Sequence, residues 1–138
     1  MPNIFRRSHQ PSYKIYELIY TPPKLNNIFD EYTNNCEKVY CGMTKSSLKT
    51  RLIQHQCRAR NPAFRHIKLY NQMFQDGPEN YRIELVQSFV YDHRDQQIQY
   101  IVAQEFEEQI INSYYRMTQE DEEENFILLN SRKIKFMP

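Results

Sequence analysis

The sequence predicts an α+β fold in which helices pack on a small sheet. Two strand-like segments lie near the start of the chain, helix-like segments follow them, and a third strand-like segment precedes a long helical pattern. The chain has 138 residues, of which 40% are hydrophobic and 25% charged, as is typical of one folded domain with a single core.

Strands are predicted at residues 13–20, 38–41 and 81–90, where β-forming residues cluster or alternate. The polar stretch between the first two strands opens with Thr-Pro-Pro, so residues 21–36 are expected to form a long loop or insertion. Gly42 is one of only two glycines and directly follows the second strand. A glycine at that point indicates a tight turn or a close approach of the backbone to a ligand.

Three helices are expected between and after these strands. The serines at 46–47 can cap a helix that runs to about Arg58, and Pro62 can open a second helix that ends near Gln75. A long helix is predicted over residues 94–115. Its apolar residues recur at helical spacing: Ile98, Ile101, Val102, Phe106, Ile110 and Ile111.

The predicted domain spans residues 13–130, between a loose N-terminal arm at 1–12 and a basic tail at 131–138. No apolar run approaches the roughly 20 residues needed to cross a bilayer, and the N-terminus has no apolar stretch typical of a secretory signal. The cysteines form no CxxC pair, and with His55 they match no common zinc spacing: Cys36, Cys41 and Cys57. We therefore expect a reduced, intracellular protein of the cytoplasm or nucleus, with no membrane partner.

Charge is segregated along the chain although the net charge is only +1. Residues 43–82 contain eight Lys or Arg and two acidic residues, whereas residues 83–125 contain eleven acidic residues and two Arg. A basic middle segment suits a face that binds a polyanion such as nucleic acid. A solvated charged surface explains the same composition, so charge alone leaves both interpretations open.

Two pairs of polar residues could carry chemistry. Arg51 and His55 lie four residues apart on the first predicted helix, so their side chains share one face beside the apolar Leu48 and Leu52. A guanidinium can bind phosphate with a planar fork, and an imidazole can hold a proton. Tyr16 and Tyr40 lie in neighbouring predicted strands, where their hydroxyls could converge. Each pair taken alone also fits ordinary packing.

Glu107 stands out on the long predicted helix. It follows Phe106 and precedes Ile110 by three residues, so it lies beside the apolar stripe, while Glu105 and Glu108 are expected to face solvent. A carboxylate near a core is costly unless a cation occupies the same place. A hard ion such as Mg²⁺ commonly takes one or two carboxylates and keeps most of its waters.

Five short segments occur in order along the chain: Lys14-Ile15-Tyr16, Val39-Tyr40-Cys41-Gly42, the helix with Arg51 and His55, Phe106-Glu107 to Ile110-Ile111, and Leu128-Leu129-Asn130. From about residue 13 to residue 130, this series resembles the motifs of the GIY-YIG nucleases. The resemblance implies a three-stranded antiparallel sheet flanked by helices. It also implies a metal-dependent endonuclease that hydrolyses phosphodiester bonds with one divalent ion, Mg²⁺ or Mn²⁺, and leaves a 5′-phosphate and a 3′-hydroxyl.

The resemblance assigns a role to each matching position. Glu107 would bind the metal and Arg51 would stabilise charge on the phosphate. Tyr16 would activate or position the attacking water with support from Tyr40, His55 would order or deprotonate a tyrosine, and Asn130 would support the site by hydrogen bonds. Candidates to contact the nucleic-acid backbone are Lys45, Lys49, Arg58, Arg60, Arg65 and Lys68.

The sequence departs from the family pattern in three respects. Lys14 stands where the family has glycine, Cys41 stands where it has isoleucine, and the 24 residues from Tyr16 to Tyr40 exceed the usual spacing. Two alternatives remain: a binding module of the same fold that does not cut, and an interaction protein that presents its acidic helix and the acidic run at 120–124 to a basic partner. DNA is favoured over RNA as substrate, and a homodimer or a partner protein could supply specificity.

Overall fold

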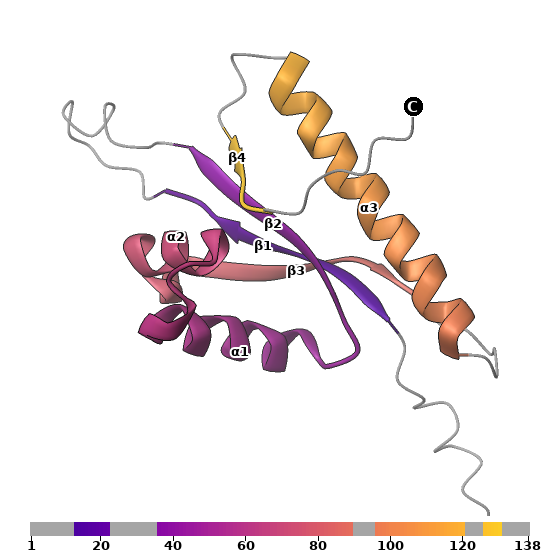
Figure 1. Ribbon diagram of the computed structural model, residues 1–138, viewed down its shortest axis with the longest axis horizontal. Helices are drawn as coiled ribbons and strands as arrows, with labels where there is room; N and C mark the ends of the chain where they lie inside the picture. The colour runs from indigo at the N-terminus through magenta and orange to yellow at the C-terminus, as the bar shows by residue number, and fades with distance from the viewer. Residues whose placement is uncertain (1–12, 23–35, 90–95, 121–125, 131–138) are drawn as a thin grey trace, which may run out of the picture.

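The computed structural model describes residues 13–22, 36–89, 96–120 and 126–130 (Figure 1). The N-terminal arm, residues 23–35 of the expected insertion, the acidic run after Glu120 and the basic tail lie outside the described residues. In chain order the elements are β1 (Lys14–Tyr20), β2 (Glu37–Thr44), α1 (Leu48–Arg60), the 3₁₀ turn η3 (Pro62–Phe64), α2 (Lys68–Asp76), the 3₁₀ turn η4 (Pro78–Asn80), β3 (Tyr81–Ser88), α3 (Gln96–Glu120) and β4 (Phe126–Leu128).

The α+β class is confirmed, but the prediction of three antiparallel strands is wrong. The sheet has four strands in the order β3-β1-β2-β4 and is mixed. β1 pairs antiparallel with both β2 and β3, whereas β4 pairs parallel with β2 from Glu37 to Val39. β4 has only three residues, which is too short for an alternating pattern to be recognised, and its partner lies far away in sequence.

The helices differ from the prediction mainly in the segment after α1. α1 begins as expected, with the side chain of Ser47 accepting a hydrogen bond from the Thr50 amide at 3.2 Å. The single helix predicted from Pro62 to Gln75 is instead a 3₁₀ turn and the separate helix α2. The break occurs because Ile67, directly before α2, is extended.

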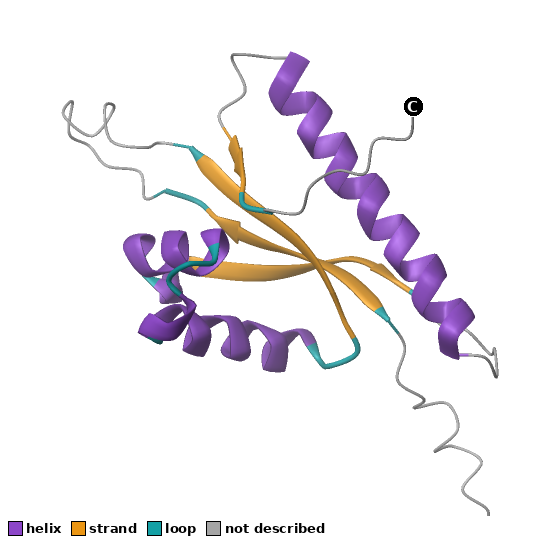
Figure 2. Cartoon of the chain, viewed as in Figure 1, coloured by secondary structure: helices purple, strands orange, loops and turns teal. Residues whose placement is uncertain are grey.

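The sheet lies between two layers of helices (Figures 1 and 2). α1 and α2 cover one face, where Tyr16 and Leu18 of β1 join the larger buried cluster. α3 covers the other face, where Ile15 and Ile111 belong to the smaller cluster, and the Tyr114 hydroxyl donates a hydrogen bond to Glu17. Among the described residues, no helix combines the length and the apolar character needed to cross a membrane.

A buried ion pair joins β2 to α2 on the face that α1 and α2 cover. The Lys38 ammonium lies 2.7 Å from the Asp76 carboxylate, and Lys38 is only 1% exposed. The Tyr81 hydroxyl of β3 donates to the same carboxylate at 2.7 Å. Because a buried charge is stable only when it is paired and hydrogen-bonded, these contacts fix β2, α2 and β3 relative to one another.

The first half of α3 is more exposed than its spacing predicts. Ile98 and Ile101 are 45% and 52% exposed, although they share the helical periodicity of buried residues further along. Ala103, Glu107 and Ile111 form the buried stripe of this helix instead. Helical spacing identifies residues that share a face, but it does not say how far the neighbouring sheet extends.

Candidate active site

Tyr16 occupies the centre of the candidate site, on the sheet face that α1 covers. Its side chain is 0% exposed. Its hydroxyl lies 2.7 Å from Nε2 of His55 and accepts a hydrogen bond from Nε of Arg51 at 3.1 Å. Arg51 and His55 reach the same hydroxyl because they lie one turn apart on α1. The structure thus brings together three of the residues that the sequence singled out.

His55 continues this hydrogen-bond network toward α2. Its Nδ1 lies 2.9 Å from the hydroxyl of Tyr70, which also accepts a hydrogen bond from Nη1 of Arg58 at 3.3 Å. His55 is 0% exposed, whereas the neighbouring Leu52 is only partly buried. The sequence interpretation of His55 as lying at the edge of an apolar stripe therefore underestimated its burial.

Tyr70 is the site residue that the sequence interpretation missed. It lies within the helix predicted from Pro62 to about Gln75, where no chemical role was assigned to it. It is one of eleven tyrosines, and nothing in its local pattern separates it from the others. Its position opposite His55 depends on the break between η3 and α2, which sets the orientation of α2.

Gly42 is required by the close approach of Tyr16. The two residues are direct partners in the β1–β2 register. A Cβ atom on Gly42 would lie 2.4 Å from the Tyr16 hydroxyl oxygen and 2.9 Å from Cε1 of Tyr40. Gly42 therefore lies inside a strand rather than in a turn, and it makes room for a tyrosine of the same chain rather than for a ligand.

Tyr40 packs beside Tyr16 and His55. Its ring centroid is 6.4 Å from that of Tyr16 and 5.7 Å from that of His55, with the latter pair edge-on. Tyr40 is partly exposed, in contrast to the fully buried Tyr16. Of the two tyrosines, Tyr40 is thus the one in contact with solvent in this conformation.

Asn130 binds the edge of β2 next to Tyr40. Its Oδ1 accepts a hydrogen bond from the Cys41 amide at 2.9 Å, and its Nδ2 donates to the Cys41 carbonyl at 2.8 Å. The side-chain amide thus makes the two backbone hydrogen bonds that a neighbouring strand would make, just beyond the end of β4 at Leu128. Asn130 thereby supports the backbone that carries Tyr40 and Gly42.

Glu107 is buried on α3, with 6% exposure. The helix contacts β2, β4 and β1, and the Glu107 carboxylate is close enough to Tyr40 to act on it electrostatically. Carboxylate oxygens are hard donors of the kind that Mg²⁺ takes in proteins. The described part of the chain contains no cluster of three His, Cys, Asp or Glu, but an ion that takes one carboxylate and keeps its waters needs no such cluster.

Burial controls the protonation of the site. Burial, with the nearby Tyr40 and despite the cation of Arg51, raises the pKa of Tyr16 far above its usual value. Burial, with Tyr70 and the Glu107 carboxylate, raises the pKa of Tyr40 to about 12. Burial and the positive charges of Arg51 and Arg58 lower the pKa of His55 to about 3. At neutral pH both tyrosines are therefore protonated and His55 is uncharged.

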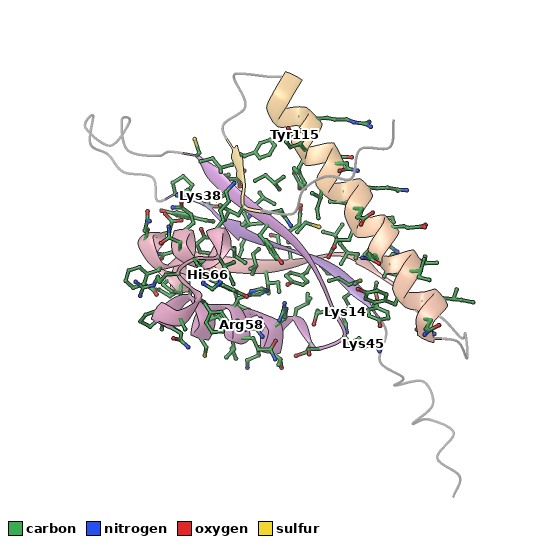
Figure 3. The ribbon with its side chains drawn as sticks, in the orientation of Figure 1. Lys14, Lys38, Lys45, Arg58, His66 and Tyr115 are labelled. Carbon is green, nitrogen blue, oxygen red and sulfur yellow. The ribbon has the colours of Figure 1, made fainter. Side chains whose placement is uncertain are left out.

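The cationic residues expected to contact nucleic acid lie on or next to α1 and α2. Figure 3 shows Lys45 where β2 turns into α1 and Arg58 further along α1. Several of these cations have partners within the chain: Lys45 lies over Tyr13, Arg58 donates to Tyr70, Arg60 pairs with Glu79 at 3.9 Å, Arg65 stacks on Phe74, and Lys68 donates to the Leu128 carbonyl. Lys49 is exposed. Lys45 and Lys49 are the two of these cations that are nearest in sequence to Arg51, which contacts Tyr16.

No family model, curated protein or solved structure matches this chain. The structure brings Tyr16, Tyr40, Arg51 and His55 into one cluster with Glu107 acting on Tyr40. Asn130 joins the cluster only through the β2 backbone.

The burial of His55 predicts an acid-sensitive fold. Because the folded pKa is about 3 and the usual value is 6.5, the unfolded chain takes up a proton between these pH values and the folded chain does not. The contribution of His55 to stability is complete above pH 6.5 and decreases as the pH falls. Relative to His55→Gln, the native chain should lose about 3 kcal/mol of unfolding free energy between pH 6.5 and pH 4.

Urea unfolding of the two chains across this pH range measures the difference. Carboxylates titrate in both chains, so their effects cancel in the comparison. Parallel stability curves would show that His55 is as easily protonated in the folded chain as in the unfolded one.

Proposed function

We propose that this chain is a metal-dependent endonuclease of the GIY-YIG type that hydrolyses phosphodiester bonds of DNA. The observation that carries the proposal is the convergence of Arg51 Nε and His55 Nε2 on the hydroxyl of Tyr16, at 3.1 Å and 2.7 Å. A phosphate-binding cation and a proton acceptor thereby share one phenol. A structural buried tyrosine needs one hydrogen-bond partner for its hydroxyl, but it does not need a cation and an imidazole together.

Arg51 connects substrate binding to Tyr16. Its Nε holds the buried hydroxyl, its Nη1 donates to Gln54 at 3.1 Å, and its side chain remains partly exposed. A scissile phosphate that engages the exposed side of the guanidinium fork lies close to the Tyr16 hydroxyl that Nε holds. Tyr16 then positions or deprotonates the attacking water, and Arg51 stabilises the charge that develops on the phosphate oxygens.

Tyr40, Glu107 and Asn130 complete the site. Tyr40 is partly exposed, so it can contact the water or the phosphate beside Tyr16. Glu107 would hold one Mg²⁺ or Mn²⁺ ion, which when bound supplies positive charge to a phosphate oxygen and to the leaving oxygen. Asn130 keeps the Tyr40 backbone in place through Cys41. Hydrolysis leaves a 5′-phosphate and a 3′-hydroxyl.

Basic residues beyond the cluster extend the proposed substrate path. Lys45 lies in the connection before α1 and Lys49 in the first turn of α1, both near Arg51 in sequence, and both are exposed. Such side chains bind phosphates without regard to sequence, so they position the duplex rather than select a site. Specificity then comes from the structure of the nucleic acid, from a second copy of the chain or from a partner protein.

A gel assay of supercoiled plasmid, single-stranded DNA and branched duplexes tests the proposal. Cutting should require Mg²⁺ or Mn²⁺ and stop with EDTA. Arg51→Ala should reduce kcat/KM by about 10²-fold, as expected when one donor to developing phosphate charge is removed. Arg82→Ala is the matched control, because this exposed arginine on β3 pairs with Glu84 at 3.0 Å, away from the cluster.

The other outcomes distinguish the alternatives. Salt-sensitive DNA binding without cutting under any metal condition would identify an inert nucleic-acid-binding module of the same fold. Neither cutting nor binding would favour an interaction protein. Equal loss of activity in the Arg51 and Arg82 variants would contradict the role given to Arg51.

A further inference from the structure

Tyr70 is the last residue of the hydrogen-bond network that runs from Arg51 through Tyr16 and His55. Its hydroxyl is 2.9 Å from Nδ1 of His55 and accepts a hydrogen bond from Arg58 at 3.3 Å. The ring centroids of His55 and Tyr70 are 5.7 Å apart. The imidazole is consequently held at both nitrogens by tyrosine hydroxyls, and each hydroxyl accepts a hydrogen bond from an arginine.

The two ends of this network differ in their access to water. A neutral imidazole donates at one nitrogen and accepts at the other, so one tyrosine donates its proton to His55 and the other accepts. Tyr16 is 0% exposed, and among the described side chains Nε2 is the acceptor within reach of its hydroxyl proton. Tyr70 is 5% exposed and accepts a hydrogen bond from the partly exposed Arg58, so its end of the network is the one nearer to solvent. In the arrangement that gives both ring nitrogens a hydrogen bond, Tyr16 donates to Nε2 and the His55 proton on Nδ1 is donated to Tyr70.

His55 cannot store a second proton in this position. Burial and the cations of Arg51 and Arg58 hold its pKa at about 3, so an imidazolium is strongly disfavoured near neutral pH. A proton that reaches Nε2 from Tyr16 must therefore be matched by the loss of the proton on Nδ1. The only described partner of Nδ1 is the hydroxyl of Tyr70.

We propose that Tyr70 is a positioning residue that fixes the Nδ1-protonated form of His55 and passes the proton of Tyr16 onward to solvent. This inference rests on the proposed function, in which Tyr16 must lose its proton to activate water. The O–H bond of Tyr16 breaks as an N–H bond forms at Nε2. The Nδ1–H bond breaks as an O–H bond forms on Tyr70, and the original proton of Tyr70 passes to a water molecule.

Tyr70→Phe tests this role because it keeps the ring and removes only the hydroxyl. Tyr81→Phe is the matched control, since it removes another buried hydroxyl from the same core cluster, where its partner is Asp76. Both variants should melt at a lower temperature than the native chain, because each leaves a buried polar partner without its hydrogen bond. Only Tyr70→Phe should reduce kcat by about tenfold to a hundredfold, with KM changed by less than about twofold.

The state of His55 provides a readout that does not depend on cutting. Nitrogen-15 NMR of the imidazole, assigned with His55→Gln, should show the proton on Nδ1 in the native chain and in Tyr81→Phe. In Tyr70→Phe the Nδ1 proton loses its acceptor, so the Nε2-protonated form should become populated. Retention of the Nδ1-protonated form and of the native kcat in Tyr70→Phe would overturn the inference.

The two readouts separate failure of the inference from failure of the proposed function. A native chain that cuts DNA, together with a Tyr70→Phe variant that cuts equally well, would overturn the inference alone. A native chain that cuts no nucleic acid would overturn the proposed function and with it the proton transfer. A tautomer shift in Tyr70→Phe would then still support the positioning of His55, and an unchanged spectrum would contradict it.

Discussion

Replacing Gly42 with alanine is expected to reduce kcat/KM by at least about 10³-fold and to destabilise the fold by about 1–3 kcal/mol. The new Cβ would lie 2.4 Å from the Tyr16 hydroxyl oxygen and 2.5 Å from its Cζ. The Tyr16 ring is fully buried, so it can move only by displacing its neighbours. Any such shift breaks its contacts with both Arg51 and His55.

The glycine variants are compared by DNA cleavage per folded molecule and by urea unfolding. Gly77→Ala is the matched control, because Gly77 has a φ of 92° at the end of α2, and alanine is strained there. A Cβ on Gly77 meets only side-chain atoms of Asn80 and Glu79 within 3.5 Å. Gly77→Ala should therefore lose stability and keep its activity. Full activity in Gly42→Ala would show that the position of Tyr16 is irrelevant to cutting.

Glu107→Gln is expected to lower metal-dependent cleavage by about 10³-fold or more. Glutamine keeps the size of the side chain and removes the negative charge that would hold the metal ion. The same change removes a charge that raises the pKa of Tyr40, so that pKa should fall in the variant. Glu105→Gln on the exposed side of α3 is the control for the loss of one acidic charge.

Metal binding to Glu107 has a measure independent of cutting. An ion that binds the folded chain raises its melting temperature in proportion to the logarithm of its concentration. Added Mn²⁺ should stabilise the native chain and Glu105→Gln, and this stabilisation should be absent from Glu107→Gln. Equal stabilisation of all three chains would place the ion elsewhere and remove the assigned role of Glu107.

Local signals in the sequence were sufficient to predict most of the helices and strands. The β-forming clusters predicted β1 and β3 nearly to their ends, and the serines before Leu48 predicted the start of α1. These features depend on neighbouring residues, such as capping by Ser47. β4 and the break after η3 escaped prediction, because pairing with Glu37–Val39 and the orientation of α2 depend on residues distant in the chain.

The candidate residues of the site were predictable as a set, but their environments were not. Arg51 and His55 share a helix face by spacing alone, and the structure places both on the Tyr16 hydroxyl. The spacing gave no indication that Tyr16 and His55 would be fully buried or that Tyr70 would join them. Burial depends on how α1 and α2 pack together over the sheet, and this is a tertiary property.

The buried network has a consequence for how this chain can change under selection. Tyr16 and Tyr70 belong to the larger core cluster, and the fully buried His55 is hydrogen-bonded to both. Loss of any one of these groups leaves a buried polar partner unsatisfied and costs stability. A descendant that had lost the chemistry would still be selected to retain all three, whereas the partly exposed Arg51 would be free to vary. Among relatives, the residue at position 51 therefore reports on activity, while the tyrosines and the histidine report mainly on folding.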